Sequence, residues 1–257
     1  MRYAKGTLAL SSKHDIPLLL QVRNSRFVTH QQLFESMQLA AIEYSRRSFN
    51  WRIRRLLESN FMSICEGNFG YGAAVYRITR HGLLQLEKHG HFAAVLNSRT
   101  QHLPHVSQGH HALELKAVQL ALARANLLAS WQSDVETASF NTVSTTPLEK
   151  DYDAVVDVWS NDKIARFALE YERTLKGARH YERIRKSLET ENKLGCILYL
   201  TAGDEIALHL ARELSGIPKR LAFATAPAFR KGLLDTMVVT DTSRAEVPFR
   251  HLLRGIF

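Results

Sequence analysis

The sequence contains few of the residues that stabilise small secreted or zinc-binding proteins. Its 257 residues include two cysteines, Cys65 and Cys196, which lie far apart and form no CxxC pair. Neither a disulfide framework nor a cysteine zinc site is therefore expected. The chain also begins without a long apolar signal-like segment, and no apolar run approaches the length of a membrane span. We expect a cytoplasmic protein without a membrane partner.

Acidic residues are scarce in the first part of the chain. Residues 1–98 contain 13 Lys and Arg against 6 Asp and Glu, whereas residues 99–257 contain 21 against 19. The formal net charge is +9, with a sequence pI near 9.7. Such an excess favours an anionic partner, most commonly nucleic acid, and the uneven distribution assigns most of the attraction to the first part. The length predicts two domains, residues 1–98 and 99–257.

The pattern of residues 1–98 predicts a winged helix-turn-helix, an α+β domain that binds DNA. An apolar helix begins near Asp15, and Thr29 and Ser45 are placed to cap a second and a third helix. Two β-prone runs around a glycine-rich tip follow within residues 61–79, and a further helix begins near Arg80. Helix, helix, helix, hairpin and helix is the order of that domain.

The third predicted helix has one apolar and one basic face. Its apolar residues recur at helical spacing. The opposite side presents the candidate DNA-binding residues Arg47, Ser48, Trp51, Arg54 and Arg55, with Arg52 as a further candidate that flanks them. Five arginines are accompanied by one acid, Glu58, within residues 46–60. Guanidinium groups neutralise phosphates and pair with guanine edges, so this face predicts contact with double-stranded DNA. The alternative is a helix face that is simply solvated.

The rest of the chain predicts a three-layer α/β domain with a mixed sheet. Residues 97–111 are polar and indicate a linker, a long amphipathic helix follows from His110, and residues 132–150 are again polar. Beyond them, apolar strand-like runs alternate with amphipathic helices. The expected strands lie within residues 153–159, 165–176, 193–202, 220–226 and 233–241, and the expected helices within residues 181–191 and 204–216.

Two of these predicted strands carry acids on one face. Because side chains alternate along a strand, Asp153 and Asp157 share a face of the first, and Glu170 and Glu172 share a face of the second. Carboxylates gathered at the end of an apolar sheet persist mainly where a cation or another positive partner compensates them. One interpretation is a Mg²⁺ site that activates water for phosphodiester chemistry, and the other is a solvated strand face.

This order of elements resembles the restriction-endonuclease-like, or PD-(D/E)XK, superfamily. Asp153 matches its first acid and Glu170 its second, while Glu172 occupies the position of the motif lysine. Glu114, on the preceding helix, matches the additional metal-binding acid of some members. The whole arrangement is similar to the replication-relaxation family of mobile-element proteins. That resemblance is carried by HALELKAVQLALARA, Trp131, Asp153-Ala154 and the segment from Glu170 to Thr174, followed by Lys186.

The resemblance implies a DNA-binding protein of a plasmid or other mobile element with a nuclease-like domain. Asp153, Glu170 and Glu114 would hold Mg²⁺, Glu172 would assist, and Lys176 or Lys186 would replace the missing motif lysine. One alternative is a non-catalytic regulator of replication or transcription, and another is a protein-interaction scaffold. Winged helices often act as dimers, so a homodimer is also considered.

Overall fold

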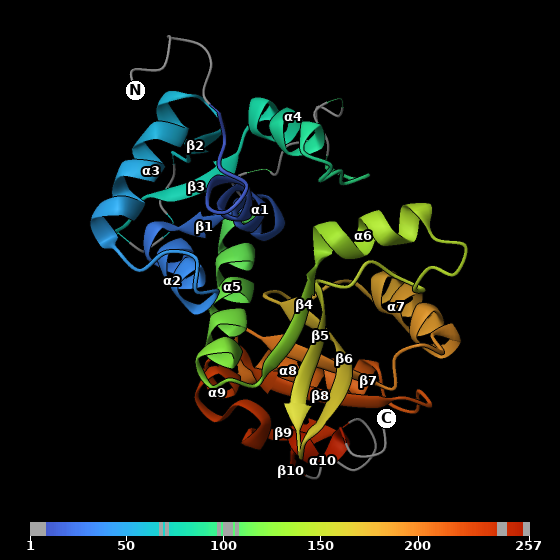
Figure 1. Ribbon diagram of the computed structural model, residues 1–257. Helices are drawn as coiled ribbons and strands as arrows, with labels where there is room; N and C mark the ends of the chain where they lie inside the picture. The colour runs from blue at the N-terminus through green and yellow to red at the C-terminus, as the bar shows by residue number, and fades with distance from the viewer. Residues whose placement is uncertain are drawn as a thin grey trace. The chain divides into compact units, whose positions relative to one another are not determined.

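The computed structural model describes residues 9–66, 69, 72–96, 99, 105, 108–240 and 246–253. The chain divides into two compact units, Met1–Lys116 and Ala117–Phe257, each of which is described separately (Figure 1). The division falls inside helix α5 (Gly109–Arg124), so the first unit includes part of a helix that the sequence analysis assigned to the second domain. No helix within the described residues is long and apolar enough to cross a bilayer.

Short helices and a small antiparallel sheet make up the first unit. In chain order before α5 they are α1 (Asp15–Ser25), β1 (Val28–Thr29), α2 (His30–Leu39), α3 (Arg46–Glu58), β2 (Met62–Ile64), β3 (Val75–Ile78) and α4 (Arg80–Lys88). The strand order is β1-β3-β2, and β3 runs antiparallel to both neighbours. The helices predicted near Asp15, Thr29, Ser45 and Arg80 and the hairpin between them are confirmed.

The starts of α2 and α3 follow from their cap residues. The Thr29 hydroxyl accepts the Gln32 N–H at 3.1 Å, and Gln32 Oε1 accepts the Thr29 N–H at 3.1 Å. Together they form a capping box, which satisfies two helix-terminal donors. At α3, the Ser45 hydroxyl accepts the Ser48 N–H at 3.3 Å. The first residues of α2 and α3 are therefore set by contacts between near neighbours in the sequence.

Replacing Thr29 by alanine is expected to cost about 1 kcal/mol of stability, because the Gln32 N–H loses its acceptor. Urea unfolding of the two proteins measures this difference. Thr29→Ser, which keeps the hydroxyl, is the matched control and should stay within about 0.5 kcal/mol of the unchanged chain. An alanine variant as stable as the serine variant would show that the cap contributes nothing.

The second unit is built around one mixed sheet. Its elements are β4 (Leu128–Ser133), α6 (Asp134–Val143), β5 (Ala154–Ser160), β6 (Lys163–Glu172), α7 (Ala178–Thr190), β7 (Cys196–Thr201), α8 (Asp204–Glu213), β8 (Arg220–Thr225), α9 (Ala226–Gly232), a 3-10 turn (Leu233–Asp235), β9 (Met237–Thr240), β10 (Glu246–Pro248) and α10 (Phe249–Leu252). The sheet has the order β10-β9-β8-β7-β6-β5-β4. Strands β6, β7 and β8 are parallel, and the other pairs are antiparallel. The predicted mixed sheet is confirmed.

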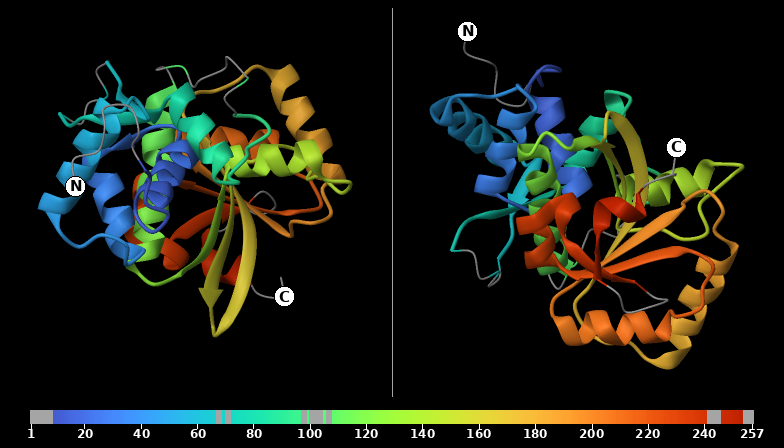
Figure 2. Two further views of the ribbon diagram at one scale, coloured as in Figure 1. Left: turned by 45° about the horizontal axis from the view of Figure 1, so that its top comes forward. Right: turned by 90° about the horizontal axis from the view of Figure 1, so that it is seen from below.

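Helices cover both faces of this sheet (Figure 2). On one face, Tyr181 and Ile184 of α7 and Leu210 of α8 pack with strand residues such as Ala168 and Tyr199. On the other face, the ring of Phe249 in α10 lies 5.1 Å from that of Phe167 in β6. Side chains alternate between the two faces along β6, so Glu170 and Glu172 point to the same face as Ala168 and away from that of Phe167. They therefore lie on the side of the sheet that α7 and α8 cover.

Several elements differ from the sequence-based expectation. The polar segment 132–150 contains the end of β4 and all of α6, which begins with a capping box between Ser133 and Glu136. Asp153 precedes β5 rather than opening it, and Thr174 lies beyond the end of β6. The two outermost strands are irregular, since β4 shifts register between Leu128 and Ser130 and β10 ends at Pro248.

Candidate functional site

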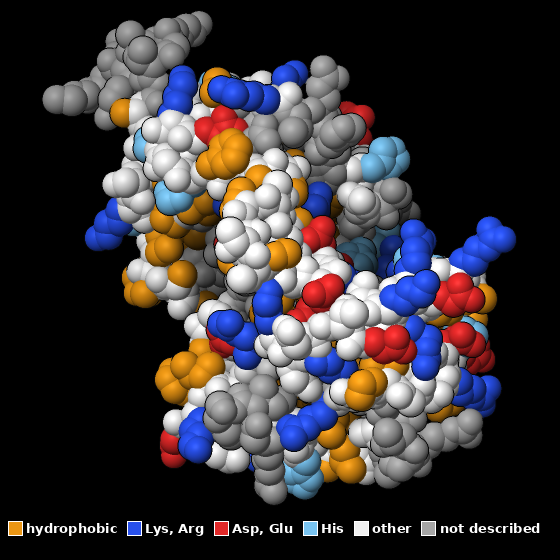
Figure 3. All heavy atoms as spheres, turned by 90° about the vertical axis from the view of Figure 1, so that its right-hand side faces the viewer, with side chains coloured by type: hydrophobic (Ala, Val, Ile, Leu, Met, Phe, Trp, Pro, Cys, Tyr) orange, Lys and Arg blue, Asp and Glu red, His pale blue; other side chains and the backbone are white. Residues whose placement is uncertain are grey.

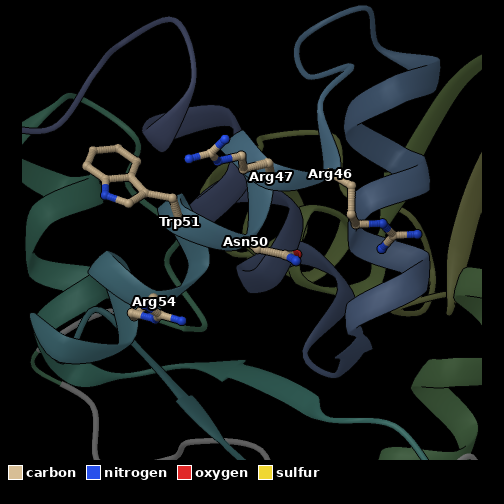
Figure 4. Close-up of a pocket in the computed structure, with 5 residues that line it drawn as sticks. All are labelled: Arg46, Arg47, Asn50, Trp51 and Arg54. Atoms are coloured by element: carbon tan, nitrogen blue, oxygen red, sulfur yellow. The ribbon is translucent and has the colours of Figure 1, made fainter.

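One face of α3 presents a group of polar and aromatic side chains. Arg46, Arg47, Asn50, Trp51 and Arg54 line a surface hollow and fan outward from the helix (Figure 4). Their spacing puts Arg47, Trp51 and Arg54 on the side of α3 opposite the buried apolar residues, with Arg46 and Asn50 at the edge of that side. Trp51 is 58% exposed, which is unusual for a large aromatic side chain. We call these five residues the α3 face.

The arginines of the α3 face are held to different degrees. The Arg46 guanidinium donates to Gln31 Oε1 at 2.6 Å and lies 3.9 Å from the centre of the Phe34 ring, so it is held against α2 (Figure 4). Arg47 and Arg54 are exposed and have no acidic partner among the described residues. Their charges are therefore available to an anion.

The structure corrects the predicted roles of Arg52, Arg55 and Ser48. Arg52 is 8% exposed, and its Nη1 donates to Asp15 Oδ1 at 2.7 Å. Arg55 also donates to Asp15, through Nη2, and its guanidinium lies 4.8 Å from the Trp51 ring centre. The Ser48 hydroxyl donates to Glu43 Oε2 at 3.0 Å. These three side chains fasten α3 to the rest of the unit.

Arg46 and Asn50 were missed by the sequence analysis. The signal was present, because the two residues are four apart and flank the predicted Arg47 and Trp51 on the helix surface. The buried position of Arg52, by contrast, has no signal in the local pattern. It depends on Asp15, 37 residues earlier in the chain.

The acids of the second unit form a cluster with two lysines. Glu170 and Glu172 are 7% and 5% exposed, so the alternative of a solvated strand face is contradicted. Lys150 Nζ lies 2.9 Å from Glu170 Oε1, and Lys176 Nζ donates to Glu172 Oε1 at 2.6 Å. Asp153 Oδ2 accepts the Tyr171 N–H at 2.8 Å. We call Lys150, Asp153, Glu170, Glu172 and Lys176 the acid–lysine cluster.

The pKa of Glu170 shows that the three acids act on one another. This pKa is raised to about 7: burial is the largest cause, the Lys150 ammonium opposes the rise, and the charges of Asp153 and Glu172 add to it. Asp153, Glu170 and Glu172 are therefore brought together, as the sequence predicted. Asp157 is not part of the group, since it accepts two hydrogen bonds from Arg166, at 2.7 and 2.8 Å.

Of the two lysines proposed from the sequence, one lies beside the acids and the other does not. Lys176 contacts an acid, as proposed, whereas Lys186 lies on the exposed side of α7 and makes no ion pair within the described residues. Lys150, which the sequence analysis did not consider, occupies the position beside Glu170. The sequence signal was its place three residues before Asp153. On the face of the molecule that Figure 3 shows, basic and acidic side chains lie next to one another.

The cluster lacks a preformed metal site. Among the described residues, no three or more His, Cys, Asp or Glu side chains are placed to hold a metal ion. Glu170 and Glu172 each face an ammonium group instead, so as placed they do not fit Mg²⁺. Glu114 lies in the part of α5 that belongs to the first unit, and its role as a ligand stays a prediction, as does the magnesium ion.

Comparisons of the chain with family models, with curated proteins and with solved structures returned no match.

Proposed function

We propose that this chain binds double-stranded DNA through α3 of its first unit. The observation that carries the proposal is the α3 face, where exposed Arg47 and Arg54 have no acidic partner within the described residues and flank Asn50 and Trp51. Unpaired guanidinium groups bind phosphates and guanine edges, and an α-helix fits the major groove. The net positive charge of the chain supports an anionic partner.

The fold of the first unit supports the same proposal. Two helices precede α3, and an antiparallel hairpin and α4 follow it, which is the order of a winged helix-turn-helix. The salt bridges of Arg52 and Arg55 to Asp15 fix α3 from behind, so its outward face is presented as a rigid surface. A rigid reading helix loses little conformational freedom on binding.

The test is the salt dependence of DNA binding. Fluorescence anisotropy with labelled duplexes should give a dissociation constant that weakens steeply as salt rises, with a log–log slope of about 0.9 for each phosphate contacted. Addition of EDTA should leave binding unchanged, because the α3 face contains no metal ligand set. Absence of any binding at low salt would refute the proposal.

A second candidate function is phosphodiester cleavage at the acid–lysine cluster. The specific observation in its favour is the buried Glu170, which shares its surroundings with Asp153, Glu172 and the ammonium of Lys150. The order α5, β4, β5, β6, α7, β7, interrupted by α6, supports the resemblance to restriction-endonuclease-like proteins. In this candidate function Lys150 replaces the missing motif lysine. Its charge would stabilise negative charge that develops on the phosphate.

Supercoiled plasmid incubated with and without Mg²⁺ tests this candidate. Asp153→Ala and Glu170→Ala should abolish nicking, and Lys150→Met should slow it by about 100-fold, the size of one lost electrostatic contact. Lys176→Met is the matched control, with an expected loss below about tenfold because Lys176 is more exposed and contacts Glu172 alone. Equal activity in Lys150→Met and the unchanged chain would remove Lys150 from the reaction.

Metal binding provides a readout that does not depend on activity. An ammonium and a divalent cation beside the same carboxylate repel each other, by about 4 kcal/mol per unit charge at 4 Å in an effective dielectric of 20. Calorimetric titration of Mg²⁺ into Lys150→Met should therefore show binding about tenfold tighter or more than into the unchanged chain. No nicking and no Mg²⁺ binding in either protein would favour the non-catalytic regulator. The role in a mobile element stays a prediction.

A further inference from the structure

A chain of side-chain hydrogen bonds runs from the sheet of the first unit to the α3 face. The Tyr76 hydroxyl in β3 lies 2.9 Å from His30 Nδ1, and His30 Nε2 lies 3.0 Å from Asn50 Oδ1. Tyr76 is 4% exposed, so this run of hydrogen bonds begins in the core, and it ends at the exposed Asn50. Asn50 is thus the member of the α3 face that is connected to the core by a continuous hydrogen-bonded path.

The His30 ring is fixed in place by its neighbours. Its centre lies 5.1 Å from the Phe49 ring and 5.9 Å from the Tyr76 ring, with both pairs near edge-to-face geometry. Burial lowers the pKa of His30, and the Arg46 charge lowers it further, against the hydrogen bond with Asn50. The imidazole is therefore neutral at pH 7, with one donor nitrogen and one acceptor nitrogen.

The direction of the hydrogen bonds follows from this neutral ring. Asn50 Oδ1 can only accept, so His30 Nε2 carries the hydrogen and His30 Nδ1 accepts from the Tyr76 hydroxyl. The oxygen end of the Asn50 amide is then occupied by His30. Its nitrogen end, with two N–H donors, makes no hydrogen bond with a described residue and lies at the hollow of the α3 face (Figure 4).

We propose that Asn50 is a base-reading residue of the α3 face and that it selects guanine. The inference rests on the DNA-binding function proposed above. Guanine presents two acceptors, N7 and O6, on its major-groove edge, which match an amide that presents its N–H donors outward. An asparagine with both ends free instead pairs with adenine, donating to N7 and accepting from N6. The His30 contact holds Oδ1 and directs the N–H end of the amide outward, which disfavours that second bond and turns the preference toward guanine.

Selection of binding sites from random duplexes, followed by affinity measurements on single-base variants of the selected site, tests this inference. The unchanged chain should prefer guanine at one position by about tenfold, and Asn50→Ala should reduce that preference to within about twofold. Preferences at the other positions should stay unchanged. Arg47→Ala, in contrast, should weaken binding to every variant of the site by a similar factor.

Tyr76→Phe is the sharper variant, because it changes neither Asn50 nor any charge. Without the hydroxyl, His30 Nδ1 can carry the hydrogen, and the Asn50 amide can turn its oxygen outward. Discrimination between guanine and adenine should therefore fall by about fivefold or more, while circular dichroism and the thermal midpoint confirm a folded protein.

The outcomes separate the two proposals. Failure of the unchanged chain to bind any duplex overturns the DNA-binding function and this inference with it. Binding with the same selected site in Asn50→Ala, or a preference for adenine at the position that Asn50 reads, overturns the role of Asn50 in selecting guanine and leaves the DNA-binding function in place.

Discussion

Replacing Arg47 and Arg54 together by alanine is expected to weaken binding to duplex DNA by about 100-fold at 0.1 M salt. Both side chains are exposed on the α3 face without an acidic partner among the described residues, so the unbound protein gives up no ion pair when they contact DNA. Each arginine that contacts a base or phosphate contributes about 1–3 kcal/mol. Because the two residues lie about two helical turns apart, their effects should be close to additive.

Fluorescence anisotropy over a range of salt concentrations measures this effect. The slope of the salt dependence should fall by about 1 for each phosphate contact removed. Arg179→Ala combined with Lys186→Ala is the matched control, since it removes the same charge from two exposed positions on α7. This control should bind within about threefold of the unchanged chain. Equal losses in the two double variants would show that binding depends on total charge and not on α3.

Replacing Asp15 by asparagine is expected to destabilise the protein by about 3–5 kcal/mol at pH 7. The Asp15 side chain is fully buried and accepts hydrogen bonds from Arg52, at 2.7 Å, and from Arg55. Its Oδ2 also accepts the Ser11 N–H at 2.8 Å. The asparagine variant leaves the Arg52 guanidinium buried with Glu43 as its remaining partner, at 3.5 Å. The same change should weaken DNA binding, because α3 loses its attachment.

The loss of folding stability at low pH gives a second measure of how much Asp15 contributes. Burial alone would raise the pKa of Asp15, but the Ser11 N–H, Arg52 and Arg55 outweigh it, so the pKa lies below its usual value of 3.8. The unfolded chain therefore takes up this proton first as the pH falls. The stabilisation is complete above about pH 4 and is lost as the pH drops through the lowered pKa.

Urea unfolding at pH 7 and at pH 3 tests both statements. The difference between Asp15→Asn and the unchanged chain should be large at pH 7 and should shrink as the pH approaches the folded-state pKa. Glu58→Gln, an acid-to-amide change at an exposed position of α3, is the control and should stay within about 0.5 kcal/mol. A loss below 1 kcal/mol for Asp15→Asn would contradict the buried ion-pair account.

Local signals in the sequence were sufficient for much of the first unit. Thr29 and Ser45 cap the helices that they were expected to cap, and the β-prone runs around residues 61–79 form the hairpin. Caps and turns depend on a few neighbouring residues, so they can be read without knowledge of the fold. Arg52, expected to flank the outward face, is buried instead because its partner, Asp15, comes from a different helix.

Elements of the second unit that depend on long-range pairing were harder to predict. β4 is half exposed and polar, and it forms only because β5 pairs with it across the intervening α6. The Ser133–Glu136 capping box of α6 was a readable signal that the polar composition of residues 132–150 concealed. Lys150 was missed for another reason, since it lies outside the motif and meets Glu170 only through the folded sheet.

The two ends of the seven-stranded sheet limit how copies of the chain can associate. An outermost strand with a regular row of free N–H and C=O groups recruits the matching strand of a second molecule. Here the irregular register of β4 interrupts that row at one end, and Pro248 removes one N–H from the short β10 at the other. A homodimer of this protein, if it forms, is therefore expected to join through side-chain surfaces and not by extending the sheet from one subunit into the next.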